Sequence, residues 1–305
     1  MTLLPTVIVA SCPLCGSSGP LQDSHIIPRF VFEWLLESSG TGHMRFGPTP
    51  NRRVQDGFKQ PLLCRGCESR LSSWESETAR SMFRPYHQDT SDALSYGPWF
   101  SKFCASVCWR VLFIFRGLGM KNYSTAQNQL ADQALQRWRY WLHDRVPHPA
   151  QFELHVLPVD LIADFYGGDL PPNINRYLAR AVEMDAVSNE NSAFVYAKLC
   201  KLILIGFVQT PNPREWVGTR VATRYGSIRP DRRGAPSQIW HYIADRARAM
   251  ARLQASMSDR QKAKIEQTMR TDLDRVAESE TFAAMAQDVS MFGRSAFSDA
   301  DDLAK

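Results

Sequence analysis

The sequence predicts an α+β fold in two parts, and three observations support this prediction. Two C-x-x-C pairs lie within the first 95 of the 305 residues. Beyond them, the spacing of apolar residues changes from helical to strand-like and back to helical. Apolar residues make up 44% of the chain and charged residues 22%, which is typical of a globular protein and not of a disordered or fibrous one. We therefore expect an N-terminal module in residues 1–95 and an α+β C-terminal region in residues 96–305.

The apolar segments indicate a protein that does not enter a membrane. The longest apolar run, residues 193–208, contains Lys198 and Lys201, whereas a membrane span needs about 20 nearly uncharged residues. The start of the chain has no basic segment, so we do not interpret it as a signal peptide. We expect a cytoplasmic protein without a membrane partner.

Four of the seven cysteines predict a metal site. In a reducing compartment, two separated C-x-x-C pairs favour zinc, because zinc binds four thiolates tetrahedrally and each tight turn supplies two. The alternative is two reduced pairs that are buried separately. We expect the Gly- and Pro-rich residues 40–57 between the pairs to be an irregular loop, so that bound zinc would contribute directly to the folding of the module. The expected ligands are Cys12, Cys15, Cys64 and Cys67.

Two helices are expected in the N-terminal module. Pro28 can open the first, and the Ser-Ser-Gly sequence at 38–40 should end it. The second should follow Cys67 and stop at Pro85. One face of this helix should be packed, because apolar residues and a threonine recur at helical spacing: Leu71, Trp74, Thr78 and Met82.

The C-terminal region should combine helices with a sheet. We expect helices over residues 98–145, a sheet over residues 150–230 and helices over residues 236–290. Within the sheet, residues 151–159 form one strand candidate, and two β-rich runs, 177–187 and 193–208, flank a hairpin turn at 188–191. On the apolar helix before the sheet, Cys104 and Cys108 are expected to pack in the core.

The positive charge is unevenly distributed. The chain carries a net charge of +5, and residues 101–150 hold seven Lys and Arg against two Asp and Glu. A second basic stretch, residues 210–234, contains six arginines and two acidic residues. Such surfaces suit an anionic polymer such as DNA or RNA, although ordinary solvated arginines are the alternative.

The residues between the cysteine pairs carry the clearest functional signal. The sequence Asp-Ser-His-Ile-Ile-Pro at 23–28 follows the first pair, and Leu-Leu-Cys-Arg-Gly-Cys-Glu at 62–68 contains the second. Over residues 10–85, this order resembles the zinc-containing HNH endonucleases, a ββα-metal nuclease family. The resemblance implies that the four cysteines hold a structural zinc, that His25 is the general base, and that Glu68 occupies the final metal-binding position, where it would hold Mg²⁺ or another divalent cation.

The chain departs from the family pattern at three positions. Glu68 stands where the family usually has the final metal-binding His. Ser24 stands where the family has an Asp or His metal ligand, and Lys59 stands where it has the middle Asn. Asn51 and Asp56 are the nearest upstream candidates for the role of the middle Asn. A hard oxygen site for the catalytic cation could instead be built from acidic residues of the module: Glu68, Glu75, Asp56 or Asp23.

Two functions follow from this pattern. The first is a metal-dependent HNH-type endonuclease that hydrolyses phosphodiester bonds in DNA, as restriction or phage-defence effectors do, with a C-terminal region that binds substrate or a protein partner. The second is a catalytically inactive, zinc-stabilised module that acts as an adaptor or inhibitor through protein partners. His25 and Glu68 favour the first function, whereas Ser24, Lys59 and the missing final His favour the second.

Overall fold

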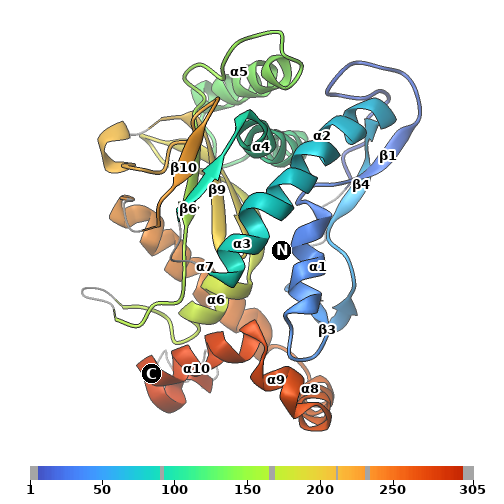
Figure 1. The fold of residues 1–305 in the computed structure, drawn as a ribbon. Helices are drawn as coiled ribbons and strands as arrows, with labels where there is room; N and C mark the ends of the chain where they lie inside the picture. The colour runs from blue at the N-terminus through green and yellow to red at the C-terminus, as the bar shows by residue number, and fades with distance from the viewer. Residues whose placement is uncertain (1–5, 90–92, 165–168, 211, 231–233, 298–305) are drawn as a thin grey trace.

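The structure is a computed structural model that describes residues 6–89, 93–164, 169–210, 212–230 and 234–297. It is a mixed α/β structure with small antiparallel sheets and many helices, as expected (Figure 1). The N-terminal third contains β1 (Leu21–His25), α1 (Arg29–Glu37), β2 (Met44–Phe46), β3 (Thr49–Val54), β4 (Lys59–Cys64), α2 (Arg65–Thr78), α3 (Arg84–Gln88) and β5 (Leu94–Tyr96).

The rest of the chain begins with two long helices and continues with a sheet and further helices. Its elements are α4 (Pro98–Leu118), α5 (Thr125–Leu142), β6 (Leu154–Pro158), α6 (Ile174–Arg180), β7 (Val182–Ser188), β8 (Ala193–Leu199), β9 (Leu202–Gln209), β10 (Gly226–Ile228), α7 (Ser237–Ala255), α8 (Asp259–Thr271), α9 (Leu273–Ala277) and α10 (Glu280–Phe292). Helices, a sheet interrupted by α6, and further helices thus follow one another along the chain. No helix of the described part is both long and apolar enough to cross a membrane.

An antiparallel strand pair followed by a helix organises the N-terminal part. Strands β1 and β4 pair so that Leu21 lies opposite Cys64 and His25 lies opposite Lys59. Helix α2 begins at the residue after β4, and α1 with the hairpin of β2 and β3 is inserted between the two strands. As expected, Pro28 precedes the first turn of α1 and Ser38 ends that helix.

The segment at 40–57 is not the irregular loop that its composition predicted. Strands β2 and β3 form an antiparallel hairpin within it, with Met44 opposite Val54 and Arg45 opposite Arg53. Gly47 and Pro48 lie between the two strands, so these residues turn the chain and do not prevent regular pairing.

The prediction that Pro85 stops the second helix is also wrong. A π-helical turn, Ala79–Phe83, follows α2 and leads directly into α3, so the helical path continues to Gln88. The change of hydrogen-bond register in the π turn places Pro85 in the first turn of α3, where a missing N–H costs little.

The larger sheet has four antiparallel strands in the order β6-β9-β8-β7. The predicted hairpin turn is present between β7 and β8, where the side-chain oxygen of Asn189 accepts hydrogen bonds from the amides of Asn191 and Ser192. Two details of the prediction are wrong. Tyr177 belongs to helix α6, and the run 193–208 is two strands joined at Cys200, whose φ is +53°. The run appeared continuous because β8 and most of β9 are buried on both faces of the sheet.

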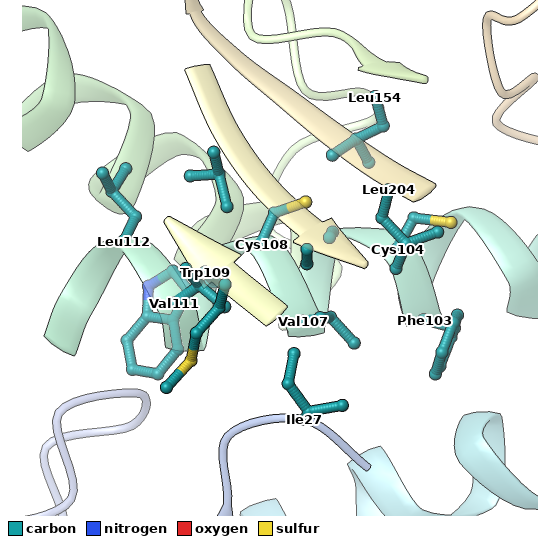
Figure 2. Packing of buried hydrophobic residues seen from close by; sticks show 14 of the residues in the cluster. Ile27, Phe103, Cys104, Val107, Cys108, Trp109, Val111, Leu112, Leu154 and Leu204 are labelled. Atoms are coloured by element: carbon teal, nitrogen blue, oxygen red, sulfur yellow. The ribbon is translucent and has the colours of Figure 1, made fainter. Parts of the chain in front are cut away.

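Each face of the sheet has its own apolar core. Helices α4 and α5 pack on one face, and α6 and α7 contribute to the cluster on the other. Figure 2 shows Cys104 and Cys108 of α4 beside Leu204 of β9, which confirms their predicted place in the core. Strand β9 lies close to α4 and α5 because Gly206 has no Cβ: a Cβ there would lie 2.9 Å from Cys108 Cβ and from the Trp138 ring.

Helix α4 also joins the sheet to the N-terminal part. It contacts α2, and Ile27, which follows β1, lies in the same apolar cluster as α4 (Figure 2). The C-terminal helices differ, because α8 and α9 bury none of their residues. These two helices lie beside α1 and β3 (Figure 1): Nη2 of Arg275 in α9 donates to the Leu36 carbonyl of α1 at 3.2 Å, and the Ser258 amide before α8 donates to Asn51 of β3.

A tetracysteine cluster and a histidine–aspartate pair

The four cysteines predicted as metal ligands lie together. Their sulfur atoms are all within 4.8 Å of one another, and Sγ of Cys15 lies 3.5 Å from Sγ of Cys64. None of the four is in a disulfide. Zinc with four thiolates at about 2.3 Å in a tetrahedron separates the sulfurs by about 3.8 Å, so the donor set and its spacing fit this ion. The cluster can therefore hold a metal ion, as predicted.

Local backbone geometry brings each pair to the cluster. The first pair lies in a tight turn in which the Gly16 amide donates to the Cys12 carbonyl at 2.7 Å, and Gly16 has φ +85°. The second pair spans the junction of β4 and α2. There, the Cys67 backbone N–H is the main group that lowers the pKa of Cys64 to about 7, whereas burial raises the pKa of Cys67.

The first cysteine turn is anchored to the C-terminal end of α5. The Leu14 carbonyl accepts hydrogen bonds from Nε of Arg139 at 2.7 Å and from Nε2 of His143 at 3.0 Å. Because Leu14 is fully buried, its carbonyl would otherwise be costly to leave unpaired. The cluster is thus fixed to β4 and α2 on one side and to α5 on the other.

His25 lies at the end of β1 and is paired with a carboxylate. Its Nε2 is 2.6 Å from Oδ1 of Asp56, in the segment that leads into β4. The Asp56 carboxylate also accepts hydrogen bonds from the Gly57 amide at 2.8 Å and from Nζ of Lys59 at 3.1 Å. Burial raises the pKa of Asp56, but these three donors outweigh burial and lower the pKa below its ordinary value.

This pairing sets the tautomer of the imidazole. A charged carboxylate accepts hydrogen bonds only, so Nε2 of His25 carries the proton and Nδ1 of the neutral ring carries the lone pair. Among the residues that the structure describes, none hydrogen-bonds Nδ1. The side chain as a whole is 17% exposed. The imidazole of His25 is therefore oriented by Asp56 and keeps Nδ1 without a partner in the described part of the chain.

A buried arginine of α4 holds the backbone of His25. Nη1 of Arg110 donates to the His25 carbonyl at 2.7 Å, and Nη2 donates to Oε1 of Glu75 at 2.7 Å. Arg110 is 1% exposed, and Nε donates to the Ser106 carbonyl. One guanidinium thus joins β1, α2 and α4, and this pairing leaves Glu75 poorly placed for the metal binding considered from sequence.

Ser24 and Glu68 have contrasting surroundings. Ser24 is 1% exposed, donates to the Gln22 carbonyl at 3.3 Å and accepts from the Leu63 amide at 3.1 Å, so its hydroxyl bridges β1 and β4. Glu68 lies in the first turn of α2, and its Oε1 is buried with no hydrogen-bond partner in the described part of the chain. A buried carboxylate oxygen without a donor is unusual, and a bound cation would satisfy it.

Not all predicted site residues are brought together. No hydrogen bond or ion pair joins His25 to Glu68, and the only group of three or more potential ligands found among the described residues is the cysteine cluster. The sequence alone did not identify Arg110 as a partner of the site. The sequence feature that indicates such a role is the position of Arg110 inside the apolar run 99–115, because a charged residue in an apolar helix is often buried together with a partner.

Comparisons with known proteins do not assign the chain to a family. No family model matches it, and neither a curated protein nor a solved structure matches it. The function of the chain is therefore inferred from its own residues.

Proposed function

We propose that this chain is a metal-dependent endonuclease of the HNH type that hydrolyses phosphodiester bonds in DNA, with zinc bound by the four cysteines. The observation that carries the proposal is the state of His25. Nε2 is hydrogen-bonded to Asp56 at 2.6 Å, Nδ1 has no hydrogen-bond partner among the described residues, and the side chain as a whole is 17% exposed. An imidazole oriented by a carboxylate in this way is suited to general-base catalysis.

His25 has a defined role in this chemistry. Nδ1 takes a proton from a water molecule while the water oxygen forms a bond to phosphorus and the bond to the leaving oxygen breaks. Asp56 stabilises the imidazolium that results, because its carboxylate accepts the Nε2–H throughout. Arg110 fixes the strand end through the His25 carbonyl, so the ring keeps its position during the reaction.

Glu68 is the acidic residue that we propose as a ligand of the catalytic cation. The three other candidates are less suited: Glu75 is paired with Arg110, Asp56 is paired with His25 and Lys59, and Asp23 is exposed. Glu68 keeps a buried oxygen without a partner. A divalent cation at this position would neutralise charge on the phosphate and assist the leaving oxygen.

DNA cleavage by variants of the full chain tests the proposal. Plasmid and phage DNA are incubated with the protein in Mg²⁺, Mn²⁺, Ni²⁺ or Zn²⁺, and cut products are measured over time. We expect His25→Ala to lower the rate by about 10²–10⁴-fold, as loss of a general base does. Glu68→Ala should lower the rate too and shift the dependence on the cation to higher concentration.

His241→Ala is a matched control, because His241 is exposed on α7. It should cut as the unchanged chain does, and all three variants should keep their zinc content and unfolding temperature. Cutting by His25→Ala at the unchanged rate would contradict the role of His25. A chain that cuts no DNA with any of the four cations would favour the second function, a zinc-stabilised binding module.

A further inference from the structure

The hairpin of β2 and β3 carries positive charge that no acidic residue balances. Residues 38–55 contain three arginines and a histidine and no Asp or Glu. Arg45 and Arg53 lie directly opposite each other across the two strands. Like charges in facing positions destabilise a strand pair, so this arrangement lowers the stability of the hairpin.

The surroundings of the hairpin do not relieve the charge. No carboxylate of the described residues forms an ion pair with Arg45, Arg52 or Arg53. Nη1 of Arg45 donates to the Pro50 carbonyl, and Nη1 of Arg53 donates to Nε2 of His43 at 2.8 Å. Burial lowers the pKa of His43, and the positive charges of Arg53, Arg45 and Arg275 lower this pKa further.

The C-terminal helices hold the hairpin in place. The Ser258 amide, which precedes α8, donates to Oδ1 of Asn51 at 2.8 Å, and Nη2 of Arg45 donates to Oε1 of Gln261 in α8 at 3.4 Å. A Cβ on Gly47 would lie 3.0 Å from the Leu253 side chain of α7. Arg52 and Arg53 remain exposed, so a braced strand presents two guanidinium groups to solvent.

The hairpin lies near His25, because the segment that follows β3 carries the hydrogen-bond partner of His25. Asp56, which hydrogen-bonds His25, follows Arg53 by three residues. An extended chain advances at most about 3.6 Å per residue, so the two Cα atoms lie within about 11 Å of each other. This distance corresponds to about three base-pair steps of 3.4 Å along a DNA duplex.

We propose that the β2–β3 hairpin is the arm that binds the phosphate backbone of duplex DNA, with Arg52 and Arg53 contacting phosphates beside the bond that is cut. The inference rests on the proposed nuclease function and names the part of the chain that holds its substrate. Phosphates would relieve the repulsion between the facing arginines, and a two-stranded ribbon fits a groove of the duplex.

Binding measured without cleavage tests this arm. A labelled DNA duplex of about 30 base pairs is titrated with the full chain in EDTA, after zinc retention is verified, over a series of salt concentrations. For Arg52→Gln/Arg53→Gln, we expect the affinity to fall about tenfold per lost contact at about 0.1 M salt, and the slope of log K against log salt to fall by about 2. The matched control is Arg270→Gln/Arg294→Gln, which removes two exposed arginines outside both basic stretches and should leave both quantities unchanged.

The outcomes separate this inference from the nuclease proposal. Hairpin-dependent binding with no His25-dependent cutting would retain the arm and reject the nuclease. His25-dependent cutting with unchanged binding by the hairpin variant would reject the arm alone. Loss of binding only in the control variant, or no binding of DNA by the unchanged chain, would also overturn the arm. Equal retention of zinc and unfolding temperature in both double variants shows that the comparison concerns binding.

Discussion

His25 at the end of β1 and His87 in α3 show how differently two regions of this chain use the same side chain. His87 is 3% exposed, and both of its nitrogens are occupied: Nδ1 donates to the Phe83 carbonyl at 2.7 Å and Nε2 accepts from the Lys201 amide at 3.1 Å. His25 is 17% exposed, and only Nε2 is occupied.

The difference identifies where chemistry can occur. Protonation of His87 would break a buried hydrogen bond, and burial lowers its pKa to about 3. Proton transfer at Nδ1 of His25 breaks no hydrogen bond of the described structure. His87 thus closes the buried amide of Lys201 where α3 meets the sheet, whereas Nδ1 of His25, at the end of β1, has no hydrogen-bond partner among the described residues.

The largest expected effect concerns the metal cluster. Cys64→Ser should remove the bound zinc, destabilise the segments between the two cysteine pairs and abolish cutting, because metal binding there contributes to folding. Elemental analysis and thermal unfolding measure this. Cys108→Ala is the matched control, since Cys108 is buried against the sheet and is not one of the four cluster cysteines. This variant should keep the zinc content of the unchanged chain. Full zinc content in Cys64→Ser would show that the ion is held elsewhere.

The next effect concerns the histidine–aspartate pair. Asp56→Asn should lower cutting by about 10–100-fold, because the asparagine amide can donate a hydrogen bond to Nε2 of His25. The ring proton then moves to Nδ1, which can no longer take a proton from water. The pH dependence of the cutting rate reports the change in the base. The control is Asp132→Asn on α5, which alters an exposed ion pair with Arg116 of α4. An unchanged rate in Asp56→Asn would remove the distinction between His25 and His87.

A glycine pair compares packing in the two regions. Gly206→Ala should lower the free energy of unfolding by about 1–3 kcal/mol, because the new methyl group would overlap Cys108 and Trp138. Gly66→Ala, in the cysteine turn of α2, meets no atom within 4 Å and should be neutral or slightly stabilising. Denaturant unfolding measures both. Equal stability of the two variants would contradict the close approach of β9 to α4 and α5.

The smallest effect is a pH dependence of stability. The pKa of His87 is about 3 in the folded chain and about 6.5 when unfolded, so the unfolded state binds more protons between these values and stability falls as the pH falls below about 6.5. We expect a loss of about 1 kcal/mol between pH 7 and pH 5.5 from this group. His87→Gln should reduce the slope in that window, and an unchanged slope would show that other groups cause the dependence.

Features marked by a short residue pattern were predictable from sequence. The cysteine spacing predicted a cluster that is present, and Pro28 and Ser38 marked the limits of α1. The β2–β3 hairpin was missed because its Gly and Pro residues were interpreted as disrupting structure, when they only turn the chain. Pro85 was misjudged because a π-helical turn depends on packing that local sequence does not reveal.

The connections of the site were less predictable because they join distant segments. Asp56 was one of several acidic candidates, and its contact with His25 depends on how the inserted helix and hairpin return the chain to β4. Arg110 reaches His25 across 85 residues of sequence. The catalytic roles of His25 and Glu68 stay predictions, since the structure establishes their surroundings and not their activity.

The contacts of Arg110 also determine which changes of chain length the protein can tolerate. An extra residue in α4 before Arg110 would rotate this side chain by about 100° around the helix axis relative to the preceding turns. Its guanidinium would then miss both the His25 carbonyl and Glu75. Helix α8 buries no residue, so an insertion there would disturb no core position. Among related sequences, the length of α4 up to this arginine should therefore be fixed, while that of α8 should vary.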